Sequence, residues 1–502
     1  MSVSRDPTSL FYKSMLFVLV LRIGLAAWFP MTADEAYFIT WGKYPDYGFY
    51  DHTPILGWLL SSFLWLSDAG WWLRMPAVLL PIFLAWGIYK ILLPRYADVA
   101  PWVAMAFLFA PINIINVLIT HDIPLIYLSF ISAWFFYKAV HVTQSKMDYL
   151  WCGLFLGLAF FSKYFAVLLG VAYGFYIVVI MRDKKSWRGL LIIFSGVLPF
   201  LFLNLLWNYN NCWNNILFNL FNRTAAADDI ATSMSIYITT LVYLISPPLI
   251  YYIFKNRKSL VSLWQNKLSQ SYMWIALFPL FLFFLLVFHK EIGLHWVLSF
   301  FPFVFVAFAS LLSTTQWRRT LIFMAAFSLL HIMILSTIMM LPETTFASKK
   351  EAVQNLTFAK YPDELLAKLA PYEENYKLAS ISYGFGSLLY YHSRKHVMII
   401  GAASFHARQD DNITDYRELD GKNILIIKRT GTNLDVFKRY FNTSQRKTIY
   451  VRDASFELLL GDGFNYNLYH KEVLERINRD YYAKPAWLPV GQCRFQSIYG
   501  LK

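Results

Sequence analysis

The chain is a succession of long apolar runs separated by short polar segments. Since about 20 apolar residues cross a bilayer, eleven runs are candidate membrane spans. They fall at roughly residues 10–30, 75–93, 99–119, 122–140, 148–162, 164–181, 188–208, 233–254, 271–288, 294–313 and 319–341. The stretch 148–181 is too long for one helix and is divided at Lys163-Tyr164. The pattern predicts an α-helical polytopic membrane protein with about 11 transmembrane helices.

Composition agrees with a membrane protein. The chain is 57% hydrophobic and 15% charged, whereas soluble domains carry roughly 25% charged residues. The net charge of +14 does not indicate a nucleic-acid partner, because the basic residues cluster between apolar runs, where they orient helices. With a cytoplasmic N-terminus, the inner loops hold most of these residues, among them Lys90, Arg95, Arg182, Arg318 and Arg319. An odd number of spans then places everything after about residue 342 outside the cytoplasm.

Residues 342–502 have a different character, with more charge and no run of spanning length. Short β-like runs at 378–382, 396–400, 423–428 and 448–451 alternate with helical patterns, which predicts a small periplasmic α/β domain. The domains are therefore a transmembrane catalytic domain at 1–341, with its first outer loop at 31–74, and the periplasmic domain at 342–502. The segment Tyr383-Gly384-Phe385-Gly386 is expected to be a structural strand-to-helix turn.

The cysteines give little further constraint. Three residues, Cys152, Cys212 and Cys493, do not make a disulfide framework. Cys152 is expected inside a membrane helix. The basic N-terminal segment precedes an apolar run without a small-residue cleavage site, so the first helix is expected to be retained rather than removed as a signal peptide.

Ionisable residues recur in three places near the predicted outer face. They are Asp34, Glu35, Asp51 and His52 in the aromatic-rich first outer loop, His121 and Asp122 at the fourth span, and Lys163 and Tyr164 between the fifth and sixth. Each has an ordinary explanation: a solvated loop acid, a helix N-cap or a snorkelling lysine. Because the topology places all three at one membrane face, a shared functional site is the better explanation.

Carboxylates on that face can act as a general base or bind a divalent metal ion. The chain has no Walker loop, nucleophile elbow or zinc-protease motif. Nucleotide donors are not free outside the cytoplasm, so a transferase there needs an activated substrate delivered by the bilayer. A lipid-phosphate donor meets this need, and basic groups or a metal would neutralise its departing phosphate.

Several segments resemble one enzyme family, in the same order and with similar spacing. They are DEAYFITWGKYPDYGFYDHTPILGWLL from residue 34, LRMPAVL from 73, THDIPLIYLSF from 120, GLFLGLAFFSKYFAVLL from 153, LPFLFLNLLWNYNNCWNNILFN from 198 and GLHWVLSFFPF from 293. Over about residues 10–315 the chain resembles bacterial glycosyltransferases of the dolichyl-phosphate-mannose protein mannosyltransferase type. That clan has the GT-C fold and includes the lipid A aminoarabinose transferases.

The resemblance implies roles for individual residues. Asp34 matches the family's catalytic base or metal-site acid, with Glu35 beside it, and Asp122 matches the acid that completes that site. Asp51 and His52 match a pair that faces the donor phosphate, where some relatives have Lys in place of His52. Further donor-phosphate contacts are Arg74, Lys163 and Tyr164, and candidate substrate contacts are Tyr37, Tyr50, His121 and His295. A divalent metal at Asp34 and Asp122 is one candidate, since some members of the family hold such an ion.

These observations predict an inverting glycosyltransferase of a bacterial inner membrane. Its donor would be a sugar on a polyprenyl phosphate such as undecaprenyl phosphate, and its acceptor lipid A, lipopolysaccharide or another envelope glycan. A protein O-mannosyltransferase is the alternative within the class. A transporter or flippase of lipid-linked sugars is the alternative from another class, although polar groups at the bilayer midplane would then be expected. The sequence names neither the sugar nor the acceptor.

Overall fold

The computed structural model describes residues 6–222, 229–346, 348–429, 433–489 and 491–501. The chain divides into two compact units. The first, called the helical unit, comprises residues 1–28, 67–203 and 224–337. The second, called the mixed unit, comprises residues 29–66, 204–223 and 338–502. The first outer loop and the end of one long helix thus belong with the C-terminal region, and the predicted domain boundary between residues 341 and 342 stays a prediction.

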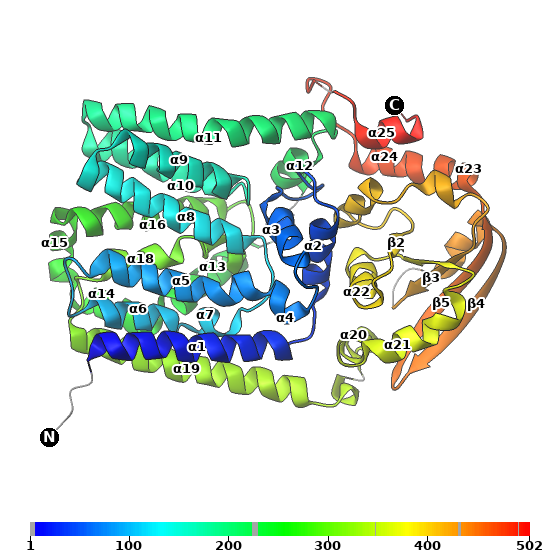
Figure 1. Cartoon of the computed structure of the whole chain (residues 1–502), viewed down its shortest axis with the longest axis horizontal. Helices are drawn as coiled ribbons and strands as arrows, with labels where there is room; N and C mark the ends of the chain where they lie inside the picture. Colours follow the sequence, from blue (N-terminus) through cyan, green and yellow to red (C-terminus); the bar gives the residue numbers. More distant parts are fainter. Residues whose placement is uncertain (1–5, 223–228, 347, 430–432, 490, 502) are drawn as a thin grey trace. The chain divides into compact units, whose positions relative to one another are not determined.

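The helical unit consists of helices joined by short connections (Figure 1). They are α1 (Pro7–Trp28), α4 (Gly70–Leu73), α5 (Met75–Leu92), α6 (Ala100–Leu108), α7 (Pro111–Ile115), α8 (Asp122–Lys138), η1 (Ala139–Thr143), α9 (Lys146–Phe160), α10 (Ala166–Phe175), η2 (Tyr176–Met181), α11 (Lys184–Asn210), α13 (Ile230–Ile245), α14 (Pro247–Lys255), η4 (Arg257–Ser259), α15 (Leu260–Gln265), α16 (Lys267–Leu286), α17 (Leu294–Val297), α18 (Phe301–Phe308) and α19 (Thr314–Met340). The last residues of α11 and α19 lie in the mixed unit. Each predicted apolar run contains one helix or a series of shorter ones.

Six of these helical segments are long and apolar enough to cross a membrane, judged over the described residues. They are Pro7–Trp28, Gly70–Leu92, Asp122–Thr143, Lys184–Asn210, Lys267–Leu286 and Thr314–Met340. A seventh is added if α13 and α14, which meet at 84°, form one broken span. The chain is therefore a multi-pass membrane protein, and the count of eleven stays a prediction. The break at Lys163-Tyr164 is confirmed, because α9 ends at Phe160 and α10 begins at Ala166.

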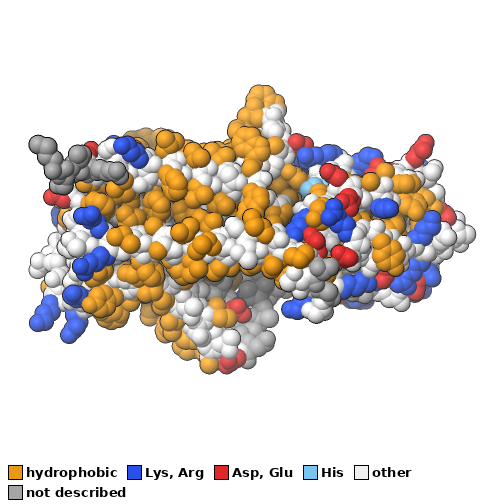
Figure 2. All heavy atoms as spheres, turned by 90° about the horizontal axis from the view of Figure 1, so that it is seen from below, with side chains coloured by type: hydrophobic (Ala, Val, Ile, Leu, Met, Phe, Trp, Pro, Cys, Tyr) orange, Lys and Arg blue, Asp and Glu red, His pale blue; other side chains and the backbone are white. Residues whose placement is uncertain are grey.

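The outer surface of the helical unit is apolar. Figure 2 shows hydrophobic side chains spread over the face formed by α1 and α19. Leu16, Phe17 and Val20 of α1 and Ile322 and Leu329 of α19 are exposed. Contiguous apolar surface of this extent is unfavourable in water and suited to lipid, where each helix satisfies its own backbone hydrogen bonds.

A buried arginine repairs a defect in the hydrogen bonding of α5. Pro81 lies inside α5 and has no N–H, so it cannot donate to the carbonyl of Ala77 one turn earlier. Arg22 of α1 supplies that donor, because its Nη2 lies 2.7 Å from the oxygen of Ala77 and 2.8 Å from that of Asn116. Its Nε donates to the carbonyl of Val78 at 3.1 Å. One guanidinium therefore ties α1 to α5 and to the segment after α7.

The mixed unit is built around a five-stranded sheet with strand order β2-β1-β3-β5-β4. The strands are β1 (Lys377–Ser380), β2 (Met398–Ile399), β3 (Ile424–Lys428), β4 (Phe441–Val451) and β5 (Ala454–Phe464). The first three are parallel, and β5 is antiparallel to both β3 and β4. The predicted strand-to-helix turn is confirmed, because β1 leads into α22 (Tyr383–Ser393), which returns to β2. Strand β5 was not predicted, since its charged and glycine residues interrupt the apolar pattern.

Other helices of the mixed unit are mostly short. They are α2 (Ala33–Lys43), α3 (Ile55–Leu64), α12 (Asn214–Leu217), η3 (Phe218–Asn222), η5 (Glu343–Phe346), α20 (Lys350–Lys360), α21 (Pro362–Leu369), η6 (Ala370–Tyr372), η7 (Phe405–Asn412), η8 (Tyr416–Leu419), η9 (Leu434–Tyr440), α23 (Tyr466–Tyr469), η10 (His470–Leu474), α24 (Glu475–Tyr481) and α25 (Arg494–Tyr499). Two hydrophobic cores cover the two faces of the sheet. Successive side chains of β3 point to opposite faces, as in any strand, and so join different cores. Ile424 and Ile426 join one core together with Tyr50 of the first outer loop, while Leu425 and Ile427 join the other.

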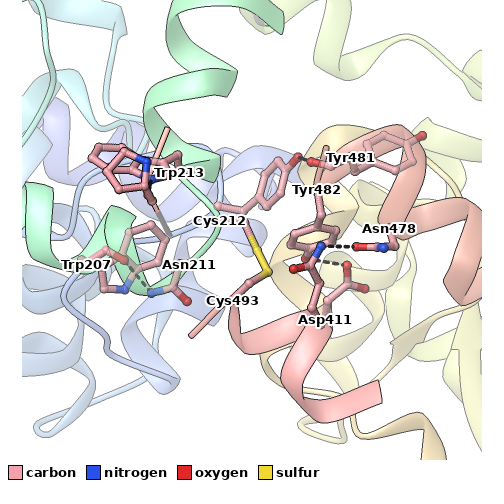
Figure 3. Close-up of a disulfide and its surroundings, with 12 residues drawn as sticks. Trp207, Asn211, Cys212, Trp213, Asp411, Asn478, Tyr481, Tyr482 and Cys493 are labelled. Carbon is pink, nitrogen blue, oxygen red and sulfur yellow. Dashed lines mark hydrogen bonds between the residues drawn. A yellow bond between two sulfur atoms is a disulfide. The ribbon is translucent and has the colours of Figure 1, made fainter. Parts of the chain in front are cut away.

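A disulfide corrects the expectation drawn from the cysteine count. Cys212, just after α11, is bonded to Cys493, just before α25, although 281 positions separate them (Figure 3). Close to the disulfide, the backbone N–H of Gly491 donates a hydrogen bond to the carbonyl of Tyr209 at 3.0 Å. Cys152 is buried and free in α9, and its place inside a membrane helix stays a prediction. The bond joins two segments of the mixed unit, and such bonds persist in oxidising compartments.

We predict that replacing Cys212 and Cys493 together by serine lowers the thermal-unfolding temperature of the purified protein. Loss of a structural disulfide typically removes about 2–4 kcal/mol of stability. The bond itself is counted by alkylating denatured protein before and after reduction, followed by intact-mass measurement. One alkylated thiol before reduction and three afterwards are expected. Three thiols in the unreduced protein would contradict the pairing, and a Cys152→Ser variant provides the matched control.

Candidate active site

Two neighbouring acids of the first outer loop have different surroundings. The sequence stretch begins helix α2, with Thr32 as its N-cap. The Thr32 hydroxyl accepts from the N–H of Glu35 at 3.3 Å, and the Glu35 carboxylate accepts from the N–H of Thr32 at 3.1 Å. This reciprocal pair is a capping box. Glu35 is 1% exposed, whereas Asp34 is exposed. Glu35 therefore secures the start of the helix, and Asp34 faces outward.

Asp51 is the centre of a buried polar cluster. Its side chain is fully buried, and the Tyr37 hydroxyl donates to Oδ1 at 3.2 Å. Nδ1 of His406 lies 2.5 Å from Oδ2, and Nδ1 of His52 lies 3.3 Å from Oδ1. Burial by itself would raise the pKa of Asp51, but the charge interaction with His52 and the hydrogen bond from His406 together hold this pKa well below its ordinary value. The carboxylate is thus kept ionised.

His406 was missed by sequence reasoning. It lies in η7, more than 350 positions from Asp51 along the chain, and no motif surrounds it. Its ring also lies 5.4 Å from that of Phe218, measured between centroids. Only the folding of the mixed unit brings this histidine to the first outer loop, so no local sequence signal could have found it.

Tyr37 and Tyr50, both predicted substrate contacts, are buried. The Tyr37 hydroxyl reaches the carbonyl of His406 at 2.9 Å in addition to Asp51. The Tyr50 hydroxyl donates to the carbonyl of Tyr481 at 2.8 Å. Tyr50 therefore holds the loop against the C-terminal region, and its predicted role toward a substrate stays a prediction.

A second group of predicted residues meets in the helical unit. Asp122 is the first residue of α8, whose first turn accommodates Pro124 because no intrahelical N–H is lost there. Lys163 lies in the break between α9 and α10, and its Nζ is 2.6 Å from Oδ1 of Asp122. Nε2 of His121 is 3.5 Å from the other carboxylate oxygen. All three side chains are buried, so the fold unites two features that were separate in the sequence.

The remaining predicted donor and substrate contacts have varied surroundings. Arg74 is buried and its Nη1 donates to the carbonyl of Ala26 at 2.8 Å. Tyr164 is half-buried, with its ring 5.1 Å from that of Phe160. His295 is exposed, and its ring lies 6.3 Å from that of His121. Arg74 thus has a structural contact, and the functional roles of all three stay predictions.

The predicted residues therefore form two groups. Asp34, Glu35, Tyr37, Tyr50, Asp51 and His52 belong to the mixed unit, and Arg74, His121, Asp122, Lys163, Tyr164 and His295 belong to the helical unit. The convergence of Asp34 and Asp122 on one site stays a prediction. In the part of the chain that the structure describes, no group of three or more His, Cys, Asp or Glu is arranged to hold a metal ion. A divalent metal at Asp34 and Asp122 stays a prediction.

Comparisons with known proteins find a family match over part of the chain and a similar fold over most of it. Residues 51–207 match the family model described as dolichyl-phosphate-mannose-protein mannosyltransferase. The fold is also similar to that of a solved membrane protein. It is similar to the crystal structure of ArnT from Cupriavidus metallidurans bound to undecaprenyl phosphate, with a TM-score of 0.63, 12% sequence identity and coverage of 90% of this chain and 98% of that chain.

The apo structure of the same ArnT gives a TM-score of 0.65, again at 12% identity, 90% coverage of this chain and 98% of that chain. A comparison with curated proteins finds no match. The family match and the shared fold confirm the resemblance to the mannosyltransferase and aminoarabinose transferase superfamily that the sequence motifs indicate.

The capping box predicts unequal effects of two substitutions at position 35. Glu35→Ala should lower the thermal-unfolding temperature by the equivalent of about 1 kcal/mol, because Thr32 and the first turn of α2 lose an acceptor. Glu35→Gln should cost less, since glutamine also serves at this position of the box. Differential scanning fluorimetry of the purified protein measures both. If Glu35→Gln is as damaging as Glu35→Ala, the carboxylate has a role other than capping.

The buried ion pair predicts strong coupling between Asp122 and Lys163. Lys163→Met leaves a buried carboxylate without its cation, and removing one member of a buried pair typically costs about 3–5 kcal/mol. The double variant Asp122→Asn with Lys163→Met should recover part of that loss. Unfolding temperatures of both single variants and the double variant measure the coupling. Additive losses would show that the two groups do not depend on each other.

Proposed function

We propose that this protein is an inverting glycosyltransferase of a bacterial inner membrane, which moves a sugar from a polyprenyl-phosphate donor to lipid A, lipopolysaccharide or another envelope glycan. One observation carries the proposal: 90% of the chain shares its fold with an ArnT structure that holds undecaprenyl phosphate. A lipid-linked donor suits a multi-pass protein, because the lipid tail stays in the bilayer while the head group reaches the membrane surface. Transfer to a protein acceptor is the alternative within this class.

Asp34 is the residue best suited to act as the base. Its carboxylate is exposed, whereas that of Glu35 is occupied by the capping box. In the proposed reaction Asp34 takes the proton of an acceptor hydroxyl as the oxygen attacks the anomeric carbon. The new C–O bond forms as the bond to the phosphate oxygen breaks, and the lipid phosphate leaves with the electron pair. Attack opposite the leaving group inverts the anomeric centre.

The departing phosphate needs positive charge close to it. Lys163 is the candidate with the best-defined position, since Asp122 holds its ammonium group at 2.6 Å. Asp122 would then position Lys163 and offset its cost of burial before the donor binds. The further donor-phosphate candidates are Asp51, His52, Arg74 and Tyr164, and His52 has a carboxylate neighbour in Asp51.

The Cys212–Cys493 bond supports an outer location for the mixed unit. Disulfides form and persist in the bacterial periplasm and are rare in the cytoplasm. Lipid A, lipopolysaccharide and envelope glycans are accessible from the same compartment. This placement agrees with the outward location of the C-terminal region that the distribution of basic residues predicts.

We predict that Asp34→Asn abolishes transfer while undecaprenyl phosphate still binds. Loss of a general base typically lowers turnover about 10²–10⁴-fold. Mass spectrometry of lipid A and total envelope glycans, from cells with and without the gene, first identifies the added mass. The same measurement on cells carrying the variant gives its activity. Asp46→Asn, which alters another acid of the same loop, should leave transfer near the level of the unchanged protein.

Two outcomes would count against the proposal. If no envelope component changes mass when the gene is present, the chain is not a glycosyltransferase of this kind. If Asp34→Asn leaves the product level unchanged, Asp34 is not the base, and a transporter of lipid-linked sugars becomes the better explanation, because transport does not require a proton acceptor at this position.

A further inference from the structure

The C-terminal region brings a tyrosine to the proposed base. Helix α22 packs closely on α2 within the mixed unit, and Gly384 permits this approach, because a Cβ there would lie 3.1 Å from the Cβ of Ala33. The preceding residue, Tyr383, has its hydroxyl 3.5 Å from Oδ1 of Asp34. The turn that the sequence marked as structural therefore places a hydroxyl beside the outward-facing acid of the first outer loop.

Tyr383 belongs to a contiguous cluster of rings. Its ring lies 5.1 Å from that of Tyr37 and 5.1 Å from that of His406, measured between centroids. Burial, followed by the charges of Asp34 and Asp51, raises the pKa of Tyr383 to about 12. The phenol therefore stays protonated at neutral pH and acts as a hydrogen-bond donor.

An open recess lies beside this cluster, between α2, α22 and η7 of the mixed unit. Its enclosed cavity volume is about 30 Å³, and the recess measures about 360 Å³ when the space open to solvent is included. Its aromatic side chains are Tyr37, Tyr383 and Tyr390, and its polar side chains include Ser387, His396 and His406. Ring faces combined with hydroxyl, imidazole and amide groups suit a ligand that has apolar C–H faces and many hydroxyls.

The charges around the recess favour a neutral ligand over a phosphate. No Lys or Arg is found among its described lining residues, although phosphate sites in proteins depend on such cations. The histidines also have carboxylate neighbours, because His406 contacts Asp51 at 2.5 Å and His396 contacts Asp410 at 3.1 Å. A nearby cation, the ammonium of Lys43, already contacts a ring, since it lies 4.6 Å from the centre of the Tyr390 ring. A hydroxyl-rich sugar ring meets these conditions better than a phosphate group does.

We infer that this recess binds the acceptor of the transfer reaction, through a sugar ring, and presents one of its hydroxyls to Asp34. The inference rests on the proposed glycosyltransferase function, because a base that removes the acceptor proton must touch the acceptor. Tyr383 lines the recess and also contacts Asp34, so a ligand held there is adjacent to the base. The C-terminal region thus provides the acceptor side of the site, and Tyr383 positions both Asp34 and the attacking hydroxyl.

The test uses the full chain in nanodiscs with membranes that supply the lipid-linked donor. The acceptor probe is the envelope lipid and glycan extract of cells lacking the gene, which contains the unmodified acceptor. Product is quantified by mass spectrometry as the amount of extract is varied, which gives an apparent KM for the acceptor. Binding of undecaprenyl phosphate, measured separately, reports on the donor side.

Ser387→Leu fills the recess and should raise the acceptor KM about tenfold, with kcat and undecaprenyl phosphate affinity close to those of the unchanged protein. Tyr383→Phe removes a single oxygen atom, so it tests the inference even if Ser387→Leu fails to fold. It should raise the acceptor KM several-fold and lower kcat. Tyr391→Phe is the matched control, because Tyr391 lies in α22 outside the recess-lining residues, and it should change neither quantity.

An unchanged acceptor KM in folded Ser387→Leu and Tyr383→Phe would overturn the inference and leave the proposed function intact. A loss of undecaprenyl phosphate affinity in these variants would also overturn it, since the recess would then belong to the donor. Absence of any transfer by the unchanged protein would instead refute the proposed function itself.

Discussion

The energetic cost of burying charge in an apolar medium governs this structure. Three charged groups that the fold buries illustrate the constraint. Arg22 is surrounded by backbone carbonyls, one of which is left without a helical donor by Pro81. Lys163 contacts Asp122, and Asp51 contacts His406 and His52. In each case at least one partner comes from a distant part of the sequence, so satisfying the charge also fixes the packing of separate elements.

Two neighbouring carboxylates of the first outer loop have different surroundings. Glu35 and Asp34 are adjacent in sequence and chemically similar, but only Glu35 closes the capping box and is buried. Asp34 remains exposed at the beginning of α2. A helix start thus distinguishes two neighbouring carboxylates, and the function proposed above uses the one whose oxygens do not hold the backbone.

The C-terminal region supplies side chains that contact the acids of the first outer loop. Its η7 contributes His406 to Asp51, and its α22 contributes Tyr383 to Asp34. The disulfide between Cys212 and Cys493 and the shared core around Tyr50 hold these segments in one unit. In the function proposed above, a loop that carries the base is therefore shaped by residues far along the chain, and a region without a catalytic motif still influences the reaction.

The sequence by itself determined the features that depend on local composition and periodicity. Apolar runs predicted the helices, including the break at Lys163-Tyr164. Short β-like runs predicted three strands of the sheet and part of a fourth. The motifs also indicated the superfamily and most of the candidate residues. Only the tertiary structure paired Lys163 with Asp122, recruited His406 and Tyr383, and joined Cys212 to Cys493. These contacts depend on which surfaces pack together, and the free energy of packing is a property of the whole chain rather than of any short segment.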